Sequence, residues 1–230
     1  MKIRKRLSLE MLSFSLLLGL GTSIGSLGLF AWLSDEVLEG ATRPFDEMTR
    51  EQVHHLAFPA LTTAMISISF LGSTIFLFFA TTVIVILFLL RRWRRDALLF
   101  GVTMLGASLL NTTLKLAFHR QRPAPYFDLS PPNSFSFPSG HALASFCFYA
   151  GLAAILTTRI ESRSVRTLMW FVATACVILI GFSRIYLGVH YTTDVIAGYS
   201  AALIWIVMVR FVEVQLARRR MRKRNAIAAE

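Results

Sequence analysis

The chain has 230 residues, of which 55% are hydrophobic, and its mean hydropathy is +0.59. This composition is too apolar for an ordinary soluble domain, in which roughly 45–50% of residues are apolar. The net charge of +11 at pH 7 is compatible with nucleic-acid binding. However, the basic residues fall in short clusters beside apolar segments, which is typical of the cytoplasmic flanks of membrane spans. We therefore expect a membrane protein with no nucleic-acid partner.

The first apolar segment, residues 11–33, follows a basic start and is the first predicted transmembrane span. A cleaved signal peptide is the alternative, but the segment is long for one and no small-x-small cleavage site follows it. Residues 34–52 are polar and acidic, and we expect them to form a loop outside the cytoplasm. Residues 53–70 carry apolar side chains at helical spacing, which predicts an amphipathic helix at the membrane interface.

Five further apolar segments have the length and composition of membrane-spanning helices. They cover residues 72–90, 97–114, 142–158, 167–182 and 195–212. The sequence therefore predicts an all-α fold, an integral membrane bundle of six transmembrane helices with an amphipathic helix after the first span. A chain of this length suits one or two domains, and we expect residues 1–230 to form a single membrane-embedded domain.

The distribution of positive charge sets the predicted orientation in the membrane. If the N-terminus is inside, 18 of the 24 Lys and Arg residues fall in the inner segments and six in the outer ones. The positive-inside rule therefore places both termini in the cytoplasm. The polar segments at residues 115–141 and 183–194 then lie on the outer face.

Cations from these outer segments form the predicted phosphate site. Lys115, Arg122 and Arg184 can offer three positive charges to a phosphate group, which carries about two negative charges near neutral pH. Arginine binds phosphate oxygens through two parallel hydrogen bonds, whereas lysine acts as a point charge. Ser139 and Gly140 open the fourth predicted span, so N–H groups at the start of that helix add donors for an anion.

Two histidines supply the predicted catalytic groups. His190 and Asp194 are four residues apart, so they share a face of a helix that begins near them. The carboxylate fixes the imidazole tautomer and leaves the other ring nitrogen free to attack phosphorus. His141 comes from another segment and can protonate the leaving oxygen, then activate the water that releases phosphate from a phosphohistidine.

No metal ion or other cofactor is expected at this site. His190 and Asp194 could act as ligands, but the sequence offers no obvious third ligand nearby, and the surrounding cations would repel a metal. Arg120 lies in the same segment but outside the motif positions. We expect this side chain to extend toward lipid headgroups.

Three motifs occur in an order and spacing that characterise one enzyme family: K-x6-RP, PSGH and SR-x5-H-x3-D. They read here as Lys115 to Arg122-Pro123, Pro138-Ser139-Gly140-His141, and Ser183-Arg184 to His190 and Asp194. The pattern resembles that of the type 2 phosphatidic acid phosphatase family, which also includes bacterial acid phosphatases and vanadium haloperoxidases. The resemblance implies a metal-independent phosphatase with His190 as nucleophile, Asp194 orienting it, and His141 as acid.

The resemblance also implies a lipid substrate, namely phosphatidylglycerol phosphate, phosphatidic acid or undecaprenyl diphosphate, at the outer face of a bacterial inner membrane. Two other functions remain open. A lipid phosphotransferase would use the same phosphohistidine intermediate. A lipid transporter would need ionisable groups near the middle of the membrane; those of the predicted spans lie at their ends, which favours chemistry at the surface.

Overall fold

The structure is a computed structural model that describes residues 2–127, 129 and 133–227, with side chains described between residues 19 and 219 of these ranges. Over the described residues the chain is helical, with one long loop between the fifth and sixth helices and shorter connections between the other helices, eight in all. The helices are α1 (Lys2–Leu38), α2 (Arg43–His54), α3 (Pro59–Phe70), α4 (Thr74–Leu90), α5 (Arg94–Phe118), α6 (Gly140–Thr157), α7 (Arg163–Tyr186) and α8 (Thr192–Ile227). The prediction of an all-α fold is confirmed.

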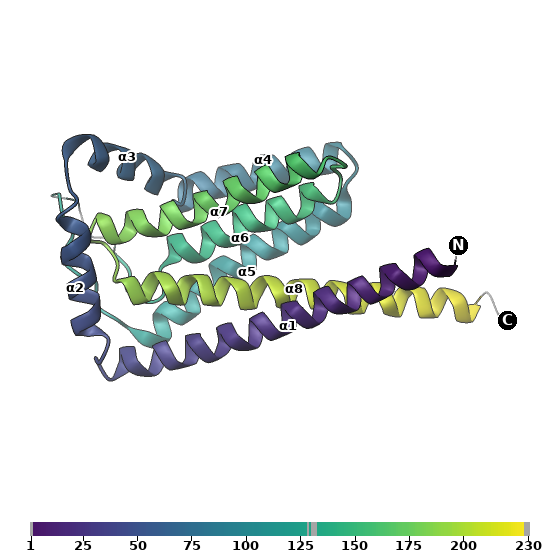
Figure 1. Cartoon of the computed structure of the whole chain (residues 1–230), viewed down its shortest axis with the longest axis horizontal. Helices are drawn as coiled ribbons and strands as arrows, with labels where there is room; N and C mark the ends of the chain where they lie inside the picture. The colour runs from purple at the N-terminus through teal and green to yellow at the C-terminus, as the bar shows by residue number, and fades with distance from the viewer. Residues whose placement is uncertain (1, 128, 130–132, 228–230) are drawn as a thin grey trace.

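The long helices form a bundle that is closed at one end by α2 (Figure 1). α1 and α8 run side by side and extend together beyond the other helices, so that α1 begins and α8 ends at the same end of the molecule. α2 lies across the opposite end. The last turns of α5 and α7 and the first turns of α6 and α8 meet at the α2 end.

Four of the described helices are long and apolar enough to cross a membrane: α5, α6, α7 and the part of α8 from Thr192 to Arg219. α3 and α4 pass the same test only as a pair, bent by 47° at the break between them. The first predicted span lies within α1, and its side chains are described only from residue 19 onward. The chain is therefore a membrane protein, and the count of six spans stays a prediction.

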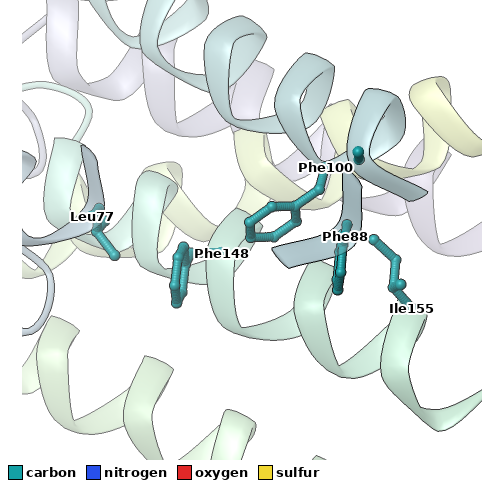
Figure 2. Close-up of a cluster of buried hydrophobic side chains, with 6 residues drawn as sticks. Leu77, Phe88, Phe100, Phe148 and Ile155 are labelled. Carbon is teal, nitrogen blue, oxygen red and sulfur yellow. The ribbon is translucent and has the colours of Figure 1, made fainter. Parts of the chain in front are cut away.

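The outward faces of these helices are apolar, as expected where lipid surrounds the bundle. Large side chains such as Phe78 of α4 and Phe171 of α7 are mostly exposed. The inward faces pack against one another, and Figure 2 shows one such cluster, which joins α4, α5 and α6. Its labelled members are Leu77, Phe88, Phe100, Phe148 and Ile155.

The prediction of a loop over residues 34–52 is wrong. α1 continues to Leu38, and most of the remaining residues form α2. The sequence allows this helix because Pro44 stands in its first turn, where a missing N–H breaks no intrahelical hydrogen bond. The acidic residues of this segment are therefore presented from a helix rather than from an irregular loop.

The prediction of one interfacial helix over residues 53–70 is also wrong in its boundaries. The segment contains the end of α2, a break, and then α3. The break follows from Pro59, which begins α3 and cannot donate a hydrogen bond to a preceding turn. Proline also disfavours a helical conformation in the residue before it, and Phe58 is extended, with φ −151° and ψ 158°.

One close helix contact places the start of α6. Gly198 of α8 packs against the backbone there, and a Cβ atom at this position would lie 2.7 Å from the carbonyl oxygen of Ser139. Any larger residue would push the two helices apart. The absence of a side chain at Gly198 thus sets the position of the PSGH segment.

Candidate active site

The three sequence motifs converge at the α2 end of the bundle. Lys115 lies in the last turn of α5, and Arg184 in the last turn of α7. Ser139 is the N-cap of α6, and Asp194 is in the first turn of α8. The motifs therefore come together because each one marks the end of a helix that terminates on this side of the bundle.

His190 is paired with Asp194, as the four-residue spacing predicts. Nδ1 of the imidazole lies 3.2 Å from Oδ2 of the carboxylate, and both side chains are almost completely buried. The same oxygen accepts the backbone N–H of Tyr191 at 2.9 Å and the hydroxyl of Ser136. The other oxygen, Oδ1, lies 2.6 Å from Nη1 of Arg120. Asp194 is thus held on all sides, and so is the imidazole it faces.

Arg122 fixes the tautomer of His190. Its Nη1 atom lies 2.9 Å from Nε2 of the imidazole. A guanidinium can only donate hydrogen bonds, so Nε2 must accept, and the ring proton must be on Nδ1. Nδ1 faces Asp194, which can accept that proton's hydrogen bond. Nε2 is therefore the unprotonated nitrogen, and its lone pair points toward the guanidinium of Arg122.

The environment keeps the His190 imidazole neutral. Burial lowers its pKa from the ordinary 6.5 to about 3, and the positive charges of Arg122 and Arg184 act in the same direction. The Asp194 carboxylate opposes this effect but does not overcome it. A neutral imidazole is the form that can act as a nucleophile.

Three cations belong to the site, and one of them, Arg122, contacts this nitrogen. Arg122 also donates from Nη1 to the carbonyl oxygen of Val189 at 2.7 Å and from Nε to that of Ser134 at 2.7 Å. Lys115 donates to the carbonyl oxygen of Phe135. Arg184 is buried, donates from Nη1 to the hydroxyl of Ser69, and keeps its Nε atom buried with no hydrogen-bond partner. An anion beside His190 would satisfy that donor and balance the three charges.

The start of α6 adds backbone donors. The Ser139 hydroxyl lies 3.5 Å from the backbone N of Ala142 and caps the helix, and the Ser139 backbone N–H donates to the carbonyl oxygen of Asp194 at 2.9 Å. Gly140 follows at the first helical position, where a Cβ atom would lie 3.0 Å from the side-chain amide of Asn111. Glycine is therefore the residue that fits here with least displacement.

His141 lies in the first turn of α6, on the same side of the bundle as His190. It is within electrostatic reach of His190 and of Arg184, Arg122 and Lys115. α3 and α4 contribute to its surroundings, since a Cβ atom on Gly72 between them would lie 3.3 Å from the imidazole Cδ2. The two histidines thus come from different helices but share one cationic environment.

The expectation that Arg120 extends to lipid headgroups is wrong. Its side chain is only 11% exposed and forms ion pairs with two fully buried carboxylates, Asp46 at 2.7 Å and Asp194 at 2.6 Å. The two carboxylates raise the pKa of the guanidinium above its ordinary value despite burial, which alone would lower it. Arg120 points inward because the site, unlike the membrane surface, offers two negative partners.

A cavity of about 670 Å³ opens beside Arg122. It is lined by the loop between α5 and α6, from Arg120 to Pro125 and from Asn133 to Phe135. Arg122 thus borders both this cavity and His190. Among the residues described with side chains, no group of three or more His, Cys, Asp or Glu residues gathers in a way that could hold a metal ion.

The sequence pattern of the PAP2 superfamily matches residues 96–216, more than half of the chain. The chain belongs to the PAP2 superfamily. The resemblance drawn from the three motifs is therefore confirmed. The matched residues contain all three motifs and the helices from α5 to most of α8, whereas α1 to α4 lie before them.

Named relatives of this PAP2 protein are phosphatases of lipids. It is 30% identical to phosphatidylglycerophosphatase B of Bacillus subtilis over 84% of this chain and 95% of that protein. It is 30% identical to undecaprenyl-diphosphatase of Sulfolobus acidocaldarius over 57% of this chain and 60% of that one. It is 35% identical to lipid A 1-phosphatase of Rhizobium johnstonii over 47% of this chain and 43% of that one. The prediction of an enzyme of the lipid phosphatase class is confirmed.

Two solved structures share the fold. The crystal structure of a transmembrane PAP2-type phosphatidylglycerolphosphate phosphatase from Bacillus subtilis superposes with a TM-score of 0.76, at 29% identity, over 84% of this PAP2 chain and 96% of the other. Aquifex aeolicus LpxE superposes with a TM-score of 0.55 at 23% identity over 72% of this chain and 94% of the other. The arrangement of helices is therefore that of membrane-embedded PAP2 proteins.

Sequence reasoning missed three residues that support the motifs of this PAP2 protein. Ser136 donates to Asp194, Asp46 pairs with Arg120, and Ser69 accepts from Arg184. Asp46 and Ser69 precede the matched residues. One signal was available for Asp46, since it is one of several acids in the segment after the first apolar run. No local pattern marks Ser69, which only the packing of α3 on α7 brings to the site.

Proposed function

We propose that this protein dephosphorylates a membrane lipid phosphate or diphosphate at the outer face of the membrane through a phosphohistidine intermediate. The observation that carries the proposal is the set of contacts around His190. Nδ1 is 3.2 Å from Asp194, and Nε2 is 2.9 Å from Arg122. One nitrogen is thus oriented by a carboxylate, while the other faces the cation that would bind a phosphate oxygen.

In the first step, Nε2 of His190 attacks phosphorus in line with the leaving oxygen. The bond from phosphorus to that oxygen breaks, and His141 donates a proton to it as general acid. Lys115, Arg122 and Arg184, together with the Ser139 hydroxyl and the backbone N–H group of Gly140, hold the equatorial oxygens. Charge spreads over these oxygens in the transition state, so fixed donors around them lower the barrier.

In the second step, water attacks phosphorus from the side that the lipid oxygen has left and displaces the imidazole. His141, now unprotonated, accepts a proton from this water as it attacks the phosphohistidine. The bond from phosphorus to Nε2 breaks, and inorganic phosphate leaves. Asp194 supports both steps, because it stabilises the positive charge that the imidazole carries while it is bonded to phosphorus. The step needs no group beyond the residues of this chain and water.

The substrate class follows from the membrane setting and the relatives. The relatives' names include a phosphatidylglycerophosphatase and an undecaprenyl-diphosphatase, so we propose phosphatidylglycerol phosphate, phosphatidic acid or undecaprenyl diphosphate. The cavity beside Arg122 would receive the polar part of such a lipid. We place both termini in the cytoplasm of a bacterial inner membrane, with residues 1–230 as one domain, six spans and the site at the outer end.

The test is phosphate release by the purified protein in detergent, with no added metal. Undecaprenyl diphosphate, phosphatidylglycerol phosphate and phosphatidic acid are supplied separately, and His190→Ala serves as the blank. We expect release from at least one lipid, none from the variant, and no loss of activity with EDTA. Substantial turnover by folded His190→Ala would refute the nucleophile assignment. A labelled phosphoryl group that reaches a second lipid or sugar instead of water would identify a phosphotransferase.

A further inference from the structure

Asp46 connects α2 to the start of α8. Its side chain is fully buried, although α2 lies across the end of the bundle (Figure 1). Oδ1 accepts the backbone N–H of Thr193 at 3.0 Å, and Oδ2 accepts the Thr193 hydroxyl at 2.7 Å. The first N–H groups of a helix have no partner within the helix. Asp46 therefore caps α8 from another helix, 147 residues earlier in the chain.

Arg120 links the same carboxylate to Asp194. Nη2 donates to Oδ2 of Asp46 at 2.7 Å, while Nη1 donates to Oδ1 of Asp194 at 2.6 Å. The guanidinium lies over the ring of Tyr191, with 4.4 Å from its central carbon to the ring centroid. Its planar fork is rigid, so the two carboxylates are held at a fixed separation and angle.

In this arrangement each carboxylate oxygen of Asp194 has a different partner. Oδ1 belongs to Arg120, which leaves Oδ2 facing Nδ1 of His190. Without Arg120, Oδ1 would lose its partner, and only the contacts of Ser136 and Tyr191 with Oδ2 would still align the carboxylate with the imidazole. A misplacement of about 1 Å can cost a reaction of this kind roughly 100-fold in rate.

Stability alone does not account for the triad of Asp46, Arg120 and Asp194. Replacing a buried ion pair by apolar side chains of similar volume is often neutral or even stabilising, because desolvation offsets the attraction between the charges. A fixed geometry is what the triad supplies beyond an apolar cluster. Only Arg120 and Asp194 fall within the residues that match the PAP2 superfamily, whereas Asp46 comes from α2 before them.

We propose that Asp46 and Arg120 are positioning residues for the nucleophile: through Asp194 they hold His190 in line with the phosphate, so that α2 is a functional part of the active site. This inference rests on the proposed role of His190. Arg120 borders the cavity beside Arg122, but its guanidinium is bound by two carboxylates, so the inference assigns it no hydrogen bond to the substrate. Neither Asp46 nor Arg120 belongs to the three motifs.

The test compares two anions that probe different features of the site. Phosphate occupies the cradle of cations only. Orthovanadate occupies the same cradle and also accepts a fifth bond, from a ring nitrogen of His190, without releasing any group. Binding of vanadate therefore depends on the position of the imidazole, whereas binding of phosphate does not. Inhibition constants for both anions are measured with kcat and KM for each variant.

Two variants remove the contacts between Arg120 and the carboxylates, and a third keeps only the positive charge. Arg120→Gln and Asp46→Asn should lower kcat by about 10- to 100-fold, the range known for groups that orient metal-binding histidines, with little change in KM. The inhibition constant for vanadate should rise with the loss in kcat, while that for phosphate stays near its original value. Arg120→Lys keeps the charge but cannot bridge both carboxylates. Its kcat should therefore lie between that of the original protein and that of Arg120→Gln.

A matched ion pair at the other end of α5 is the control. Arg159 and Asp96 form an ion pair there, and Arg159 lies over Trp93. Asp96→Asn and Arg159→Gln should leave kcat and the ratio of the two inhibition constants unchanged. If Arg120→Gln does not fold, Asp46→Asn still decides, because its amide oxygen can accept the N–H of Thr193.

Unchanged kcat in folded Asp46→Asn and Arg120→Lys would overturn the inference. So would a loss of kcat with no change in the ratio of inhibition constants, because that result would mean a structural role only. His190→Ala is assayed beside them to separate the two proposals. If it is inactive while the positioning variants are normal, only this inference fails; if it remains active, the proposed nucleophile fails.

Discussion

Nη1 of Arg122 lies 2.9 Å from Nε2 of His190. The cation that would grip a phosphate oxygen therefore touches the nitrogen that would attack phosphorus. A phosphoryl group bound to this guanidinium is brought next to the nucleophile, and the guanidinium must transfer its hydrogen bond from nitrogen to oxygen as the substrate enters. Binding and alignment are performed by one side chain.

We expect Arg122→Lys to lower kcat/KM strongly although the positive charge is kept. Lysine has neither the planar fork nor the reach to contact both Ser134 and His190 as arginine does. Loss of one fixed donor to a transition-state oxygen costs about 100- to 1,000-fold in other enzymes. The measurement is steady-state kinetics on the preferred lipid, with Arg159→Lys as the control for the same change at the other end of the molecule. Near-normal kinetics in Arg122→Lys would mean that charge alone is sufficient.

The lowered pKa of His190 has a consequence for stability at acidic pH. In the unfolded chain this imidazole titrates near 6.5, whereas in the folded protein its pKa is about 3. Between these values the unfolded state binds more protons, so the free energy of unfolding falls as the pH is lowered from about 6.5 toward 3. At pH 7 both states are largely neutral at this position, and the contribution of His190 does not vary there.

Thermal unfolding in detergent at a series of pH values tests this sign. Other groups titrate in the same range, so the comparison is with His190→Gln, which cannot take up the proton. The stability of the original protein relative to the variant should decline from pH 7 to pH 4. A difference that stays constant over this range would show that His190 titrates alike in both states. Acid alone should not inactivate the nucleophile at pH 5, where the folded imidazole is still neutral.

His141→Gln should separate the two steps of the reaction. A lipid alkoxide is a poor leaving group and needs the general acid, which typically contributes about 100- to 10,000-fold. p-Nitrophenolate leaves without protonation, so phosphorylation of His190 by p-nitrophenyl phosphate should remain fast. The second step still lacks its base, and the phosphohistidine should accumulate. A rapid-mixing assay should therefore show a burst of p-nitrophenolate close to one equivalent of enzyme. Equal losses on both substrates with no burst would assign His141 to binding.

Gly198→Ala should reduce both stability and activity. The added Cβ atom would lie 2.7 Å from the carbonyl oxygen of Ser139, so α6 must move away from α8, and the N–H donors at its start must move with it. Gly101→Ala is the matched control, because a Cβ atom there meets nothing within 4 Å. In a helix that exchange should be stabilising by about 0.5–1 kcal/mol. Melting temperature and kcat are measured for both, and a harmless Gly198→Ala would mean that the two helices are not in close contact.

The motifs could be found from sequence because their chemistry is local. His190 and Asp194 meet through the four-residue spacing of a helical turn, and Ser139 caps α6 because a hydroxyl before an apolar run favours a helix start. The apolar segments likewise predicted helices, since a backbone in lipid must satisfy its hydrogen bonds within each segment. These features depend only on a few neighbouring residues, so they can be predicted without knowing how distant helices pack.

The polar segment before α4 could not be assigned in the same way. Acidic residues at 34–52 suggested a loop, and helical spacing over 53–70 suggested one helix, whereas the structure has a break that Pro59 enforces. In that region the polar side chains are not all directed to solvent. Asp46 and Ser69 are buried, because their partners come from distant parts of the chain.

By itself the sequence determined the helical class, the three motifs, and the pairing of His190 with Asp194, because spacing along one chain fixes which residues share a turn. Only the tertiary structure decided the role of Arg120. An isolated arginine beside a membrane favours the headgroups, but two buried carboxylates, one from α2 and one from α8, draw it inward. Which partner a long charged side chain chooses depends on where opposite charge is buried, and that depends on how distant helices pack.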